Sequence, residues 1–540
     1  MNVKGKTKDN GTNCRNDIAL YCNRPELELR MNNRRMVANK AKYTLDANQQ
    51  VIVLQWITRL GFPDGFASRL GGYVNLKDRK LTGYKSHDAH VFLEILMAIA
   101  FRGLLPVNIW GPVSELCTFF RDICGSSLDT DRMSIWKRNI VDTLCKLETI
   151  FPPSFFDSME HLPVHLADEV LLGGPVHYRW MYPFERFIYR LKNSAGSRSR
   201  VEASILNAYL QLEVTFLGSD YLEPEFQTKA RRLNRNEVLV GVEEEGAISI
   251  YNYPGCGGRI IGKRRLTDSE FYKATHYILS NTPEFDTYLA QFDFELRYNH
   301  PDFNDVQIYN ETLNKLSSWI QEHIWHLGEH YEVLEWIHQL SEGFDRRVAF
   351  TSTYKVNNYK FHTEQHSTGK PKKHCQVHVK GTEGNHFYGV IEEILHMRWK
   401  TNNRMKVVLF KCRWFDPRYV VSLPANGIVE VNTQRIYQAY DPFIIAQQAD
   451  QVYFTDFPGQ PNRTTQGWVA VCRVKPTNAI DLNVSELAFQ EDAEPNSQIP
   501  LVNVFSAFEE LADNVVNIYD NTEDAIEELD ENEGYEHSTY

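Results

Sequence analysis

The spacing of hydrophobic residues changes once along this chain, and no other feature restricts its fold as much. Between residues 46 and 222 apolar side chains recur every three or four positions, which is typical of helices that bury one face. The runs with this spacing are VIVLQWITRL, HVFLEILMAIAF, VSELCTFFRDIC and IVDTLCKLETIF, separated by Pro and Gly signals. Between residues 351 and 476 the runs become short, β-branched and aromatic, as in YKFHT, CQVHVKG, KVVLFKCRWF and GWVAVCRVKP. We therefore expect an α+β, multi-domain protein in which an α-helical domain precedes a small, mostly β, barrel-like domain of SH3-like or similar type.

Three further segments complete the predicted organisation. The full division is a polar remnant (1–45), the helical domain (46–222), a linker with helical segments (223–350), the small β domain (351–476) and an acidic tail (477–540). The linker contains Gly255, Gly257 and Gly258, which are followed by basic residues but have neither a preceding strand nor Walker spacing. A nucleotide-binding loop needs both features, so we interpret this Gly-rich basic segment as part of the linker.

The acidic residues are concentrated at the C-terminal end. Residues 481–540 contain 17 Asp and Glu but no Lys or Arg, which leaves 53 acidic and 58 basic residues, a balance of +5, in residues 1–480. Such a density of like charges predicts a disordered tail. The tail is either simply solvated or competes with DNA for a basic face of the body.

Composition indicates a soluble, intracellular protein. With 540 residues, 42% of them hydrophobic, the chain can bury two or three cores. No apolar run reaches the roughly 18 residues of a membrane span, and the N-terminal MNVKGKTKDNG is polar, so we expect no membrane partner. The nine scattered cysteines include no Cys-x-x-Cys pair and are expected to be reduced thiols in a cytosolic or nuclear setting.

His161 and His165 are candidates for metal binding. They are four residues apart, so on a helix they share a face and can close on one ion, and neutral imidazole is the commonest zinc ligand. Pro163 lies between them, which favours the first turn of a helix or a bent segment. Structural zinc sites usually have four ligands, so the alternative is two half-buried histidines that are hydrogen-bonded within a helical core.

Glu185 is the single carboxylate of the aromatic-rich run WMYPFER. An ionised acid in apolar surroundings is costly unless a cation, a metal ion or hydrogen bonds receive it. Arg179, Arg186 or Arg190 is near enough in sequence to be that cation. A divalent metal ion is the functional alternative.

A small-residue loop, SAGSRSRVEASI, carries two further candidates. Arg198 and Arg200 suit contacts with DNA phosphates, and a merely exposed loop explains them equally well. Two histidine-rich stretches are not assigned to a metal: His323, His326, His330 and His338, and His374, Cys375, His378 and His386. The second stretch lies on expected strands, where alternation points neighbouring side chains to opposite faces.

Long, ordered runs of this sequence are similar to one family. They are GKTKDNGTNCRNDIALYCNRPEL (5–27), FPDGFASRLGGYVNLKDRKLTGYKSHDAHVFLEILMAIAFRGLLP (62–106), LCKLETIFPPSFFDSMEHLPVHLADEVLLGGPVHYRWMYPFERFIYRLKN (144–193), NNYKFHTEQH (357–366), FYGVIEEIL (387–395), VVLFKCRWFDP (407–417), YDPFIIAQQADQVYF (440–454) and WVAVCRVKP (468–476). Together they resemble the C-terminal part of plant CACTA (En/Spm-type) transposases, including its two uncharacterised transposase-associated domains. The resemblance extends over most of the chain up to about Pro476.

This resemblance implies a fold and a site. CACTA elements are grouped with two-metal, DDE-type DNA transposases, in which an RNase H-like core uses two aspartates and a late acidic residue to hold two divalent ions. In that group a His pair, preceded by a Cys-x-x-Cys, binds Zn²⁺ shortly before the late acid. His161 and His165 match the His pair, and Glu185, 20 positions beyond His165, matches the late catalytic, metal-binding acid. The helical domain is then expected to be the tail of the RNase H-like core with a helical insertion.

The family pattern also implies that parts of the site are missing. The two aspartates and the Cys-x-x-Cys belong before Gly5, so the resemblance implies a truncated transposase. A two-metal reaction needs several carboxylates. We therefore expect no independent catalysis, with Mg²⁺ or Mn²⁺ acting only if the missing catalytic half is supplied.

Two classes of function stay open. The first is a DNA-transposition protein, or its non-catalytic remnant, which acts on transposon ends in the nucleus together with DNA and other transposase subunits. The second is a non-catalytic DNA- or protein-binding interaction protein recruited from a transposon.

Overall fold

The computed structural model describes most of the chain between residues 24 and 476. The described residues are 16, 24–25, 28–32, 35–38, 40–152, 155–193, 199–221, 255–330, 342–381, 385–399, 406–423, 427–437, 442–459 and 467–476. The acidic tail and much of the polar remnant lie outside these ranges. The expectations for both segments therefore stay predictions.

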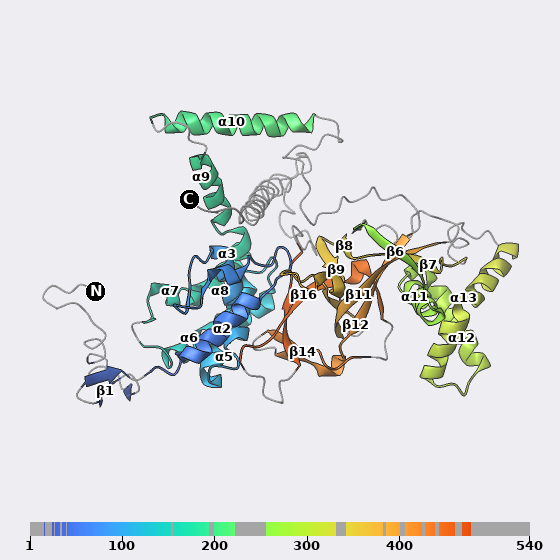
Figure 1. The fold of residues 1–540 in the computed structure, drawn as a ribbon, viewed down its shortest axis with the longest axis horizontal. Coiled ribbons are helices and arrows are strands. Elements are labelled where there is room, and N and C mark those ends of the chain that lie inside the picture. Colours follow the sequence, from blue (N-terminus) through green and yellow to red (C-terminus); the bar gives the residue numbers. More distant parts are fainter. Residues whose placement is uncertain are drawn as a thin grey trace, which may run out of the picture.

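The N-terminal half is helical, as the hydrophobic spacing predicts (Figure 1). Its helices are α2 (Ala47–Arg59), α3 (Ser86–Val91), a π-helical turn (Phe92–Leu96), α4 (Met97–Phe101), α5 (Val107–Ile123), α6 (Thr130–Glu148), α7 (Ser158–His161), α8 (Pro163–Gly173), α9 (Tyr182–Asn193) and α10 (Val201–Asp220). Two short antiparallel hairpins accompany them: β1 (Leu29–Asn32) with β2 (Arg35–Ala38), and β3 (Val74–Asn75) with β4 (Lys80–Leu81).

Side chains near the helix ends explain where α2 begins and α6 ends. The carboxylate of Asp46 accepts a hydrogen bond from the backbone N–H of Gln49 at 2.8 Å, and the Gln49 side chain accepts from the backbone of Asp46 at 2.9 Å. This capping box satisfies two otherwise unpaired N–H groups of α2. At the end of α6 the Arg24 guanidinium donates to the carbonyl oxygens of Glu148 and Thr149, both at 2.9 Å. A cation at this position complements the helix dipole.

Three helices of this half, α5, α6 and α8, share a small apolar cluster. Its buried members are Phe119, Ile123, Cys124, Met133, Trp136, Ile140, Ala167 and Val170. They recur at helical spacing within each helix, so the packing follows the amphipathic pattern of the sequence. The indole N–H of Trp136 donates to the Asp122 carboxylate at 2.7 Å, which satisfies the polar edge of this cluster.

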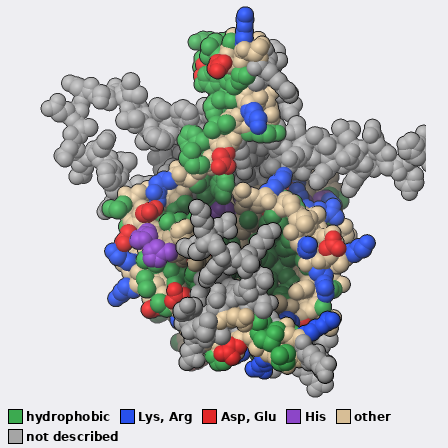
Figure 2. All heavy atoms as spheres, turned by 90° about the vertical axis from the view of Figure 1, so that its left-hand side faces the viewer, with side chains coloured by type: hydrophobic (Ala, Val, Ile, Leu, Met, Phe, Trp, Pro, Cys, Tyr) green, Lys and Arg blue, Asp and Glu red, His purple; other side chains and the backbone are tan. Residues whose placement is uncertain are grey.

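The last two helices of this half, α9 and α10, project from the remainder (Figure 1). Large apolar side chains lie exposed along both, and Figure 2 shows hydrophobic side chains on this projection. Phe184 is 59% exposed, Ile188 60% and Leu217 60%. No helix among the described residues is long and apolar enough to cross a membrane.

The C-terminal half is built on a large antiparallel sheet. In spatial order the strands of its main path are β13 (Val420–Leu423), β14 (Ile428–Asn432), β17 (Trp468–Arg473), β16 (Asp450–Thr455), β10 (Gln376–Lys380), β11 (His386–Arg398), β12 (Lys406–Trp414) and β15 (Phe443–Ile445). Off this path, β7 (Arg347–Thr351) pairs with β11, and β6 (Ile260–Arg265) pairs with β7. A second sheet contains β5 (Cys256–Gly257), β8 (Thr353–Val356) and β9 (Tyr359–His362).

The α+β class is confirmed, but the barrel is not. Within the described residues the strands form a path with two ends, β13 and β15, and no closed barrel. The sheet also branches at the 13-residue strand β11, which pairs with β12 along one edge. Along its other edge, residues 386–390 pair with β10, and residues 394–396 pair with β7.

The Gly-rich basic segment is also not the linker that we expected. Its residues form β5 and β6, which join the second sheet and the main sheet respectively. Gly262 shows why glycine suits this strand, because a Cβ there would lie 3.0 Å from the Phe350 ring. The close approach of the two strands needs the missing side chain.

Strand β12 is buried on both faces of the sheet. Val408, Phe410 and Cys412 belong to one core, whereas Val407 and Leu409 belong to another. Alternate residues of a strand point to opposite faces, so a continuous apolar run is required where both faces are covered. The run KVVLFKCRW meets this requirement.

The second of these cores is covered by a helical layer at one end of the sheet (Figure 1). Its helices are α11 (Asp268–Ser280), α12 (Asp286–Asn299) and α13 (Asp305–His330), and a short helix, α15 (Glu364–Ser367), follows β9. Phe271, Phe292 and Ile320 pack from this layer against Leu395 and Leu409 of the sheet. The helical segments expected within residues 223–350 are thereby found in the described part of this range.

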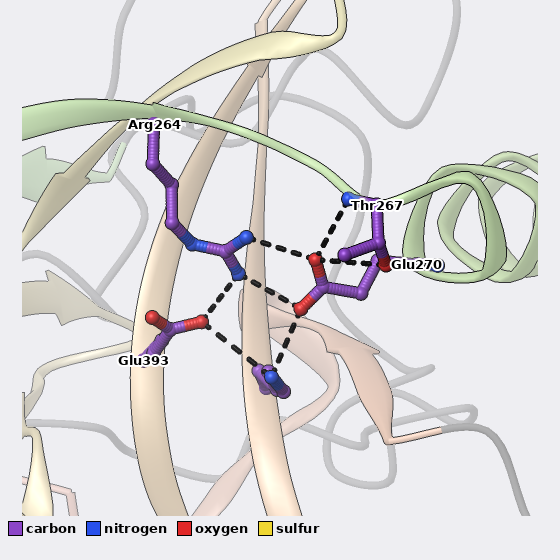
Figure 3. A network of polar contacts seen from close by, with 5 residues as sticks. Arg264, Thr267, Glu270 and Glu393 are labelled. Carbon is purple, nitrogen blue, oxygen red and sulfur yellow. Dashed lines mark hydrogen bonds and ion pairs between the residues drawn. The ribbon is translucent and has the colours of Figure 1, made fainter.

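A charged network joins α11 to the sheet (Figure 3). Arg264 donates to both carboxylate oxygens of Glu270, at 2.8 and 3.0 Å, and to Glu393 at 2.5 Å. Lys411 donates to Glu270 at 2.9 Å. The hydrogen bond from Arg264 is the main reason why the pKa of Glu270 falls to about 2. Glu270 also accepts from the backbone N–H of Thr267 and so completes the capping box of α11.

The helical half and the sheet share the first core. Trp56 and Ile57 of α2 lie in the same apolar cluster as Phe361 and Phe410 of the strands. Polar contacts reinforce the junction: the Trp56 indole donates to the carbonyl oxygen of Asp456 at 2.7 Å. The two halves are therefore not separate domains with independent cores.

Candidate metal-binding residues of the helical region

The structure brings His161 and His165 together. Their Nε2 atoms are 3.2 Å apart, and both side chains are exposed. Helix α7 ends at His161, and Pro163 is the first residue of α8, so the proline lies in a first turn as expected. A capping box between Asp157 and Glu160 begins α7 and holds His161 in place.

The separation of the two rings suits a single zinc ion. Zn–N distances of about 2.0–2.1 Å at a tetrahedral angle place two nitrogens about 3.3 Å apart. The exposed position excludes the alternative of two half-buried histidines in a core. The pair supplies two ligands of the usual four, and the Cys-x-x-Cys that accompanies it in the resembling family is absent from this sequence. Zinc binding at the pair stays a prediction.

Glu185 lies in the first turn of α9 and is exposed. Our premise of an acid buried among aromatic residues is therefore wrong. The helix turns the residues of the aromatic run in different directions, because neighbours in an α-helix are about 100° apart. Phe184 and Ile188 are exposed beside Glu185, whereas Trp180 and Tyr182 turn inward. An exposed carboxylate is hydrated and requires no partner.

Glu185 does not join the His pair. Among the described residues, His161, His165 and Glu185 do not form a group whose ligand atoms all lie within 4.8 Å of one another. The two parts of the predicted site are thus separate.

The basic loop is described only in part. Arg198 lies outside the described residues. Arg200 is exposed directly before α10, and its carbonyl oxygen accepts from the backbone N–H of Ser204 at 3.1 Å. The start of a helix offers unpaired N–H groups that favour phosphate oxygens, so Arg200 is placed where an anion can be received.

The inward residues of the aromatic run reveal a group that sequence reasoning missed. Tyr182 and Trp180 contact His90, whose Nδ1 lies 2.9 Å from Oε1 of Glu94. His90, Glu94 and Cys124 are the one group of three possible metal ligands found in the described part of the chain. The His90 to Glu94 spacing of four was a signal in the sequence. Cys124 is 30 residues further on, and no local pattern connects it to them.

Two histidines of the stretches that we left unassigned have other contacts, whereas His338 lies outside the described residues. The His323 ring stacks on Trp319, with ring centres 4.5 Å apart, so it belongs to the packing between α12 and α13. Nε2 of buried His378 lies 2.8 Å from Nδ1 of His386, and Nδ1 of His378 lies 3.3 Å from Asp450. These are chains of hydrogen bonds rather than convergent ligands.

Comparison with known proteins identifies two domain families. Domain of unknown function DUF4218 matches residues 123–237, and domain of unknown function DUF4216 matches residues 397–471. Both are commonly found in plant transposase-like proteins. No curated protein and no solved structure matches this chain. The first match includes His161, His165 and Glu185, and the second includes β12 to β16 and part of β17. The two matches are consistent with a transposon-derived protein.

Proposed function

We propose that this chain is a transposon-derived protein of the CACTA type, which takes part in DNA transposition in the nucleus but does not cut DNA by itself. The observation that carries this proposal is the presence of both transposase-associated domains in one chain, in the order of the resembling family. The first match includes His161, His165 and Glu185, and the second includes β12 to β16 and part of β17.

The exposed position of Glu185 supports a role that depends on other residues. A late acid must approach two divalent ions that are held by further carboxylates. Among the described residues Glu185 belongs to no group of three possible metal ligands. Glu185 would therefore act only where aspartates from another segment or subunit meet it, and these would hold Mg²⁺ or Mn²⁺. The His pair would hold Zn²⁺ beside them.

DNA is the proposed partner because of charge. Residues 1–480 carry a balance of +5, and Arg198 and Arg200 occupy the loop before α10. Basic side chains that contact phosphates release counterions, which gives DNA affinity without sequence selection. Selection of transposon ends would need contacts with base edges in addition.

The experiment combines binding and cleavage on one DNA. The purified chain is mixed with a duplex that carries CACTA-type terminal repeats, or with a shuffled duplex, in the presence of Mg²⁺ or Mn²⁺. We expect a gel shift that favours the terminal repeats and no nicking. Glu185→Gln should leave both results unchanged, as should Glu202→Gln, a matched exposed acid in the first turn of α10.

Two results would contradict the proposal. Metal-dependent nicking that Glu185→Gln abolishes and Glu202→Gln preserves would mean that the chain is a complete nuclease. Equal, weak binding of both duplexes would favour the alternative, an interaction protein recruited from a transposon. The observation that favours this alternative is the apolar surface of α9 and α10, where Ile188 and Leu217 are each 60% exposed.

A further inference from the structure

We propose that His90, Glu94 and Cys124 form a second zinc site, which joins α9 to the body of the helical region. His90 and Glu94 lie in one of the runs that resemble the family (62–106), but the resemblance assigns no role to them or to Cys124.

The three side chains converge from three elements of the fold. Their possible ligand atoms all lie within 4.8 Å of one another, and Nδ1 of His90 is 2.9 Å from Oε1 of Glu94. Ligand atoms around a tetrahedral zinc ion are about 3.2 to 3.8 Å apart, given Zn–N, Zn–O and Zn–S distances of about 2.0 to 2.3 Å. Rotation of these side chains suffices to close the group on one ion.

The backbone is irregular at this place. His90 lies in α3, Glu94 lies in the π-helical turn that follows, and Cys124 is the C-cap of α5. A π-helical turn widens a helix and costs conformational free energy, so it persists only where the surroundings maintain it. Such turns are frequent at functional sites. Here the turn directs Glu94 toward Cys124.

The second nitrogen of His90 already has the partner that a metal ligand needs. Nε2 lies 3.2 Å from the hydroxyl oxygen of Tyr182, the first residue of α9. A histidine that binds zinc through one nitrogen usually donates its other N–H to an oxygen, which fixes the ring. The Trp180 ring packs edge-on against the same imidazole, with ring centres 5.5 Å apart. These contacts hold His90 with Nδ1 turned toward Glu94.

The donor set indicates the kind of ion. One thiolate, one imidazole and one carboxylate are the ligand types of zinc, and three protein ligands leave a fourth position for water. The thiolate and the carboxylate together balance the two positive charges of the ion. Cys124 is 5% exposed, which is unfavourable for a free thiolate but suits one bound to a metal. Without an ion, the thiol of Cys124 donates to Glu94, so a metal-free hydrogen-bonded group is the competing arrangement.

The site would control the position of α9. Tyr182 begins α9, and Glu185 lies one turn further along the same helix. Zinc at His90 would strengthen the hydrogen bond to Tyr182, since a bound imidazole is a better donor. The metal would thereby order the helix that carries the candidate late acid.

The test uses Co²⁺ as a probe of the thiolate. The purified full chain is freed of metal with a chelator and titrated with Co²⁺, and then with Zn²⁺. We expect a cobalt–thiolate charge-transfer band that saturates at one equivalent and disappears as Zn²⁺ displaces Co²⁺. The His161 and His165 pair contains no sulfur, so it cannot produce this band, and His165→Gln should leave it intact.

Variants separate this site from the other thiols. Cys124→Ser should abolish the band, whereas Cys145→Ser, which changes an exposed cysteine of α6, should preserve it. Tyr182→Phe should weaken binding by about 10- to 100-fold while retaining the band. His90→Gln and Glu94→Gln keep the thiol, so they provide the test if Cys124→Ser does not fold.

Each remaining outcome overturns the proposal. Absence of the band in the unaltered chain would identify the metal-free group, and a band that survives Cys124→Ser would come from another thiol. Binding that is unchanged in both His90→Gln and Glu94→Gln would exclude these residues as ligands.

Discussion

Replacement of Glu270 by glutamine tests the charged network between α11 and the sheet. The carboxylate accepts two hydrogen bonds from Arg264 and one from Lys411, which lower its pKa from 4.5 to about 2. A shift of this size corresponds to about 3 kcal/mol of folding free energy, since one pH unit is worth about 1.4 kcal/mol. Solvent reaches 17% of the side chain and screens the pair, so we expect about 2 kcal/mol.

The sign of the pH dependence follows from the direction of the shift. The folded protein has the lower pKa, so the contribution of Glu270 is complete above the unfolded value of 4.5 and is lost as the pH falls toward about 2. Glu270→Gln should therefore destabilise the protein most at neutral pH. At pH 3.5 the difference between the two proteins should be about 1.2 kcal/mol smaller than at pH 7.

Urea unfolding at pH 7, 4.5 and 3.5 measures these differences, and hydrogen exchange of residues 268–280 reports on α11 itself. Glu322→Gln, on an exposed position of α13, is the matched control and should change the free energy of unfolding by less than about 0.5 kcal/mol. The reasoning fails if Glu270→Gln behaves like the control at pH 7. It also fails if the destabilisation is the same at all three pH values.

Three further perturbations test the core, the junction and the tail. Phe410→Ala removes a fully buried ring whose centre lies 5.1 Å from that of Phe361. It should lower the free energy of unfolding, measured in urea, by about 3 to 5 kcal/mol. Val421→Ala, at a 40% exposed position, should lower it little. Gly61→Ala should lower the melting temperature because the new Cβ would collide with the Pro371 carbonyl oxygen. Gly72→Ala, with no atom within 4 Å of its Cβ, should not lower it. Equal melting temperatures would refute the close approach of Gly61 to Pro371. Deletion of residues 481–540 removes 17 acidic side chains and should strengthen non-specific DNA binding in gel-shift titrations at low salt. Equal affinities of the full and shortened chains at low salt would show that the tail does not compete with DNA.

Local periodicity predicted the elements of this fold better than their partners. The run VIVLQWITRL lies largely within α2, and KVVLFKCRWF includes β12, because burial on one or two faces leaves a period in the sequence itself. The pairing of β6 with β7 joins segments about 85 residues apart, and neither segment carries a signal for the other. The expected barrel is not found among the described residues, and the sequence also carries no signal for which strands share an edge of β11.

The candidate site shows the same division between local and distant information. The spacing of His161 and His165 predicted their convergence, because two residues four apart on a helix are neighbours. The exposure of Glu185 was not predictable from the aromatic character of its neighbours, since a helix distributes adjacent residues around its axis. The contact of His90 with Tyr182 spans 92 residues and depends on how α9 packs. No motif of fixed spacing can contain it.

The hydrogen bond from Trp56 to Thr455 closes a loop of 399 residues, and this has a consequence during synthesis. Ribosomes add roughly 5 to 20 residues per second, so α2 leaves the ribosome roughly 20 to 80 s before β16 is made. Throughout this interval the apolar face formed by Val53, Trp56 and Ile57 lacks the strands that cover it. Contacts between such distant residues also form slowly, since a long loop must close first. We therefore expect the yield of folded chain in a cell to rise with the supply of chaperones that shield α2.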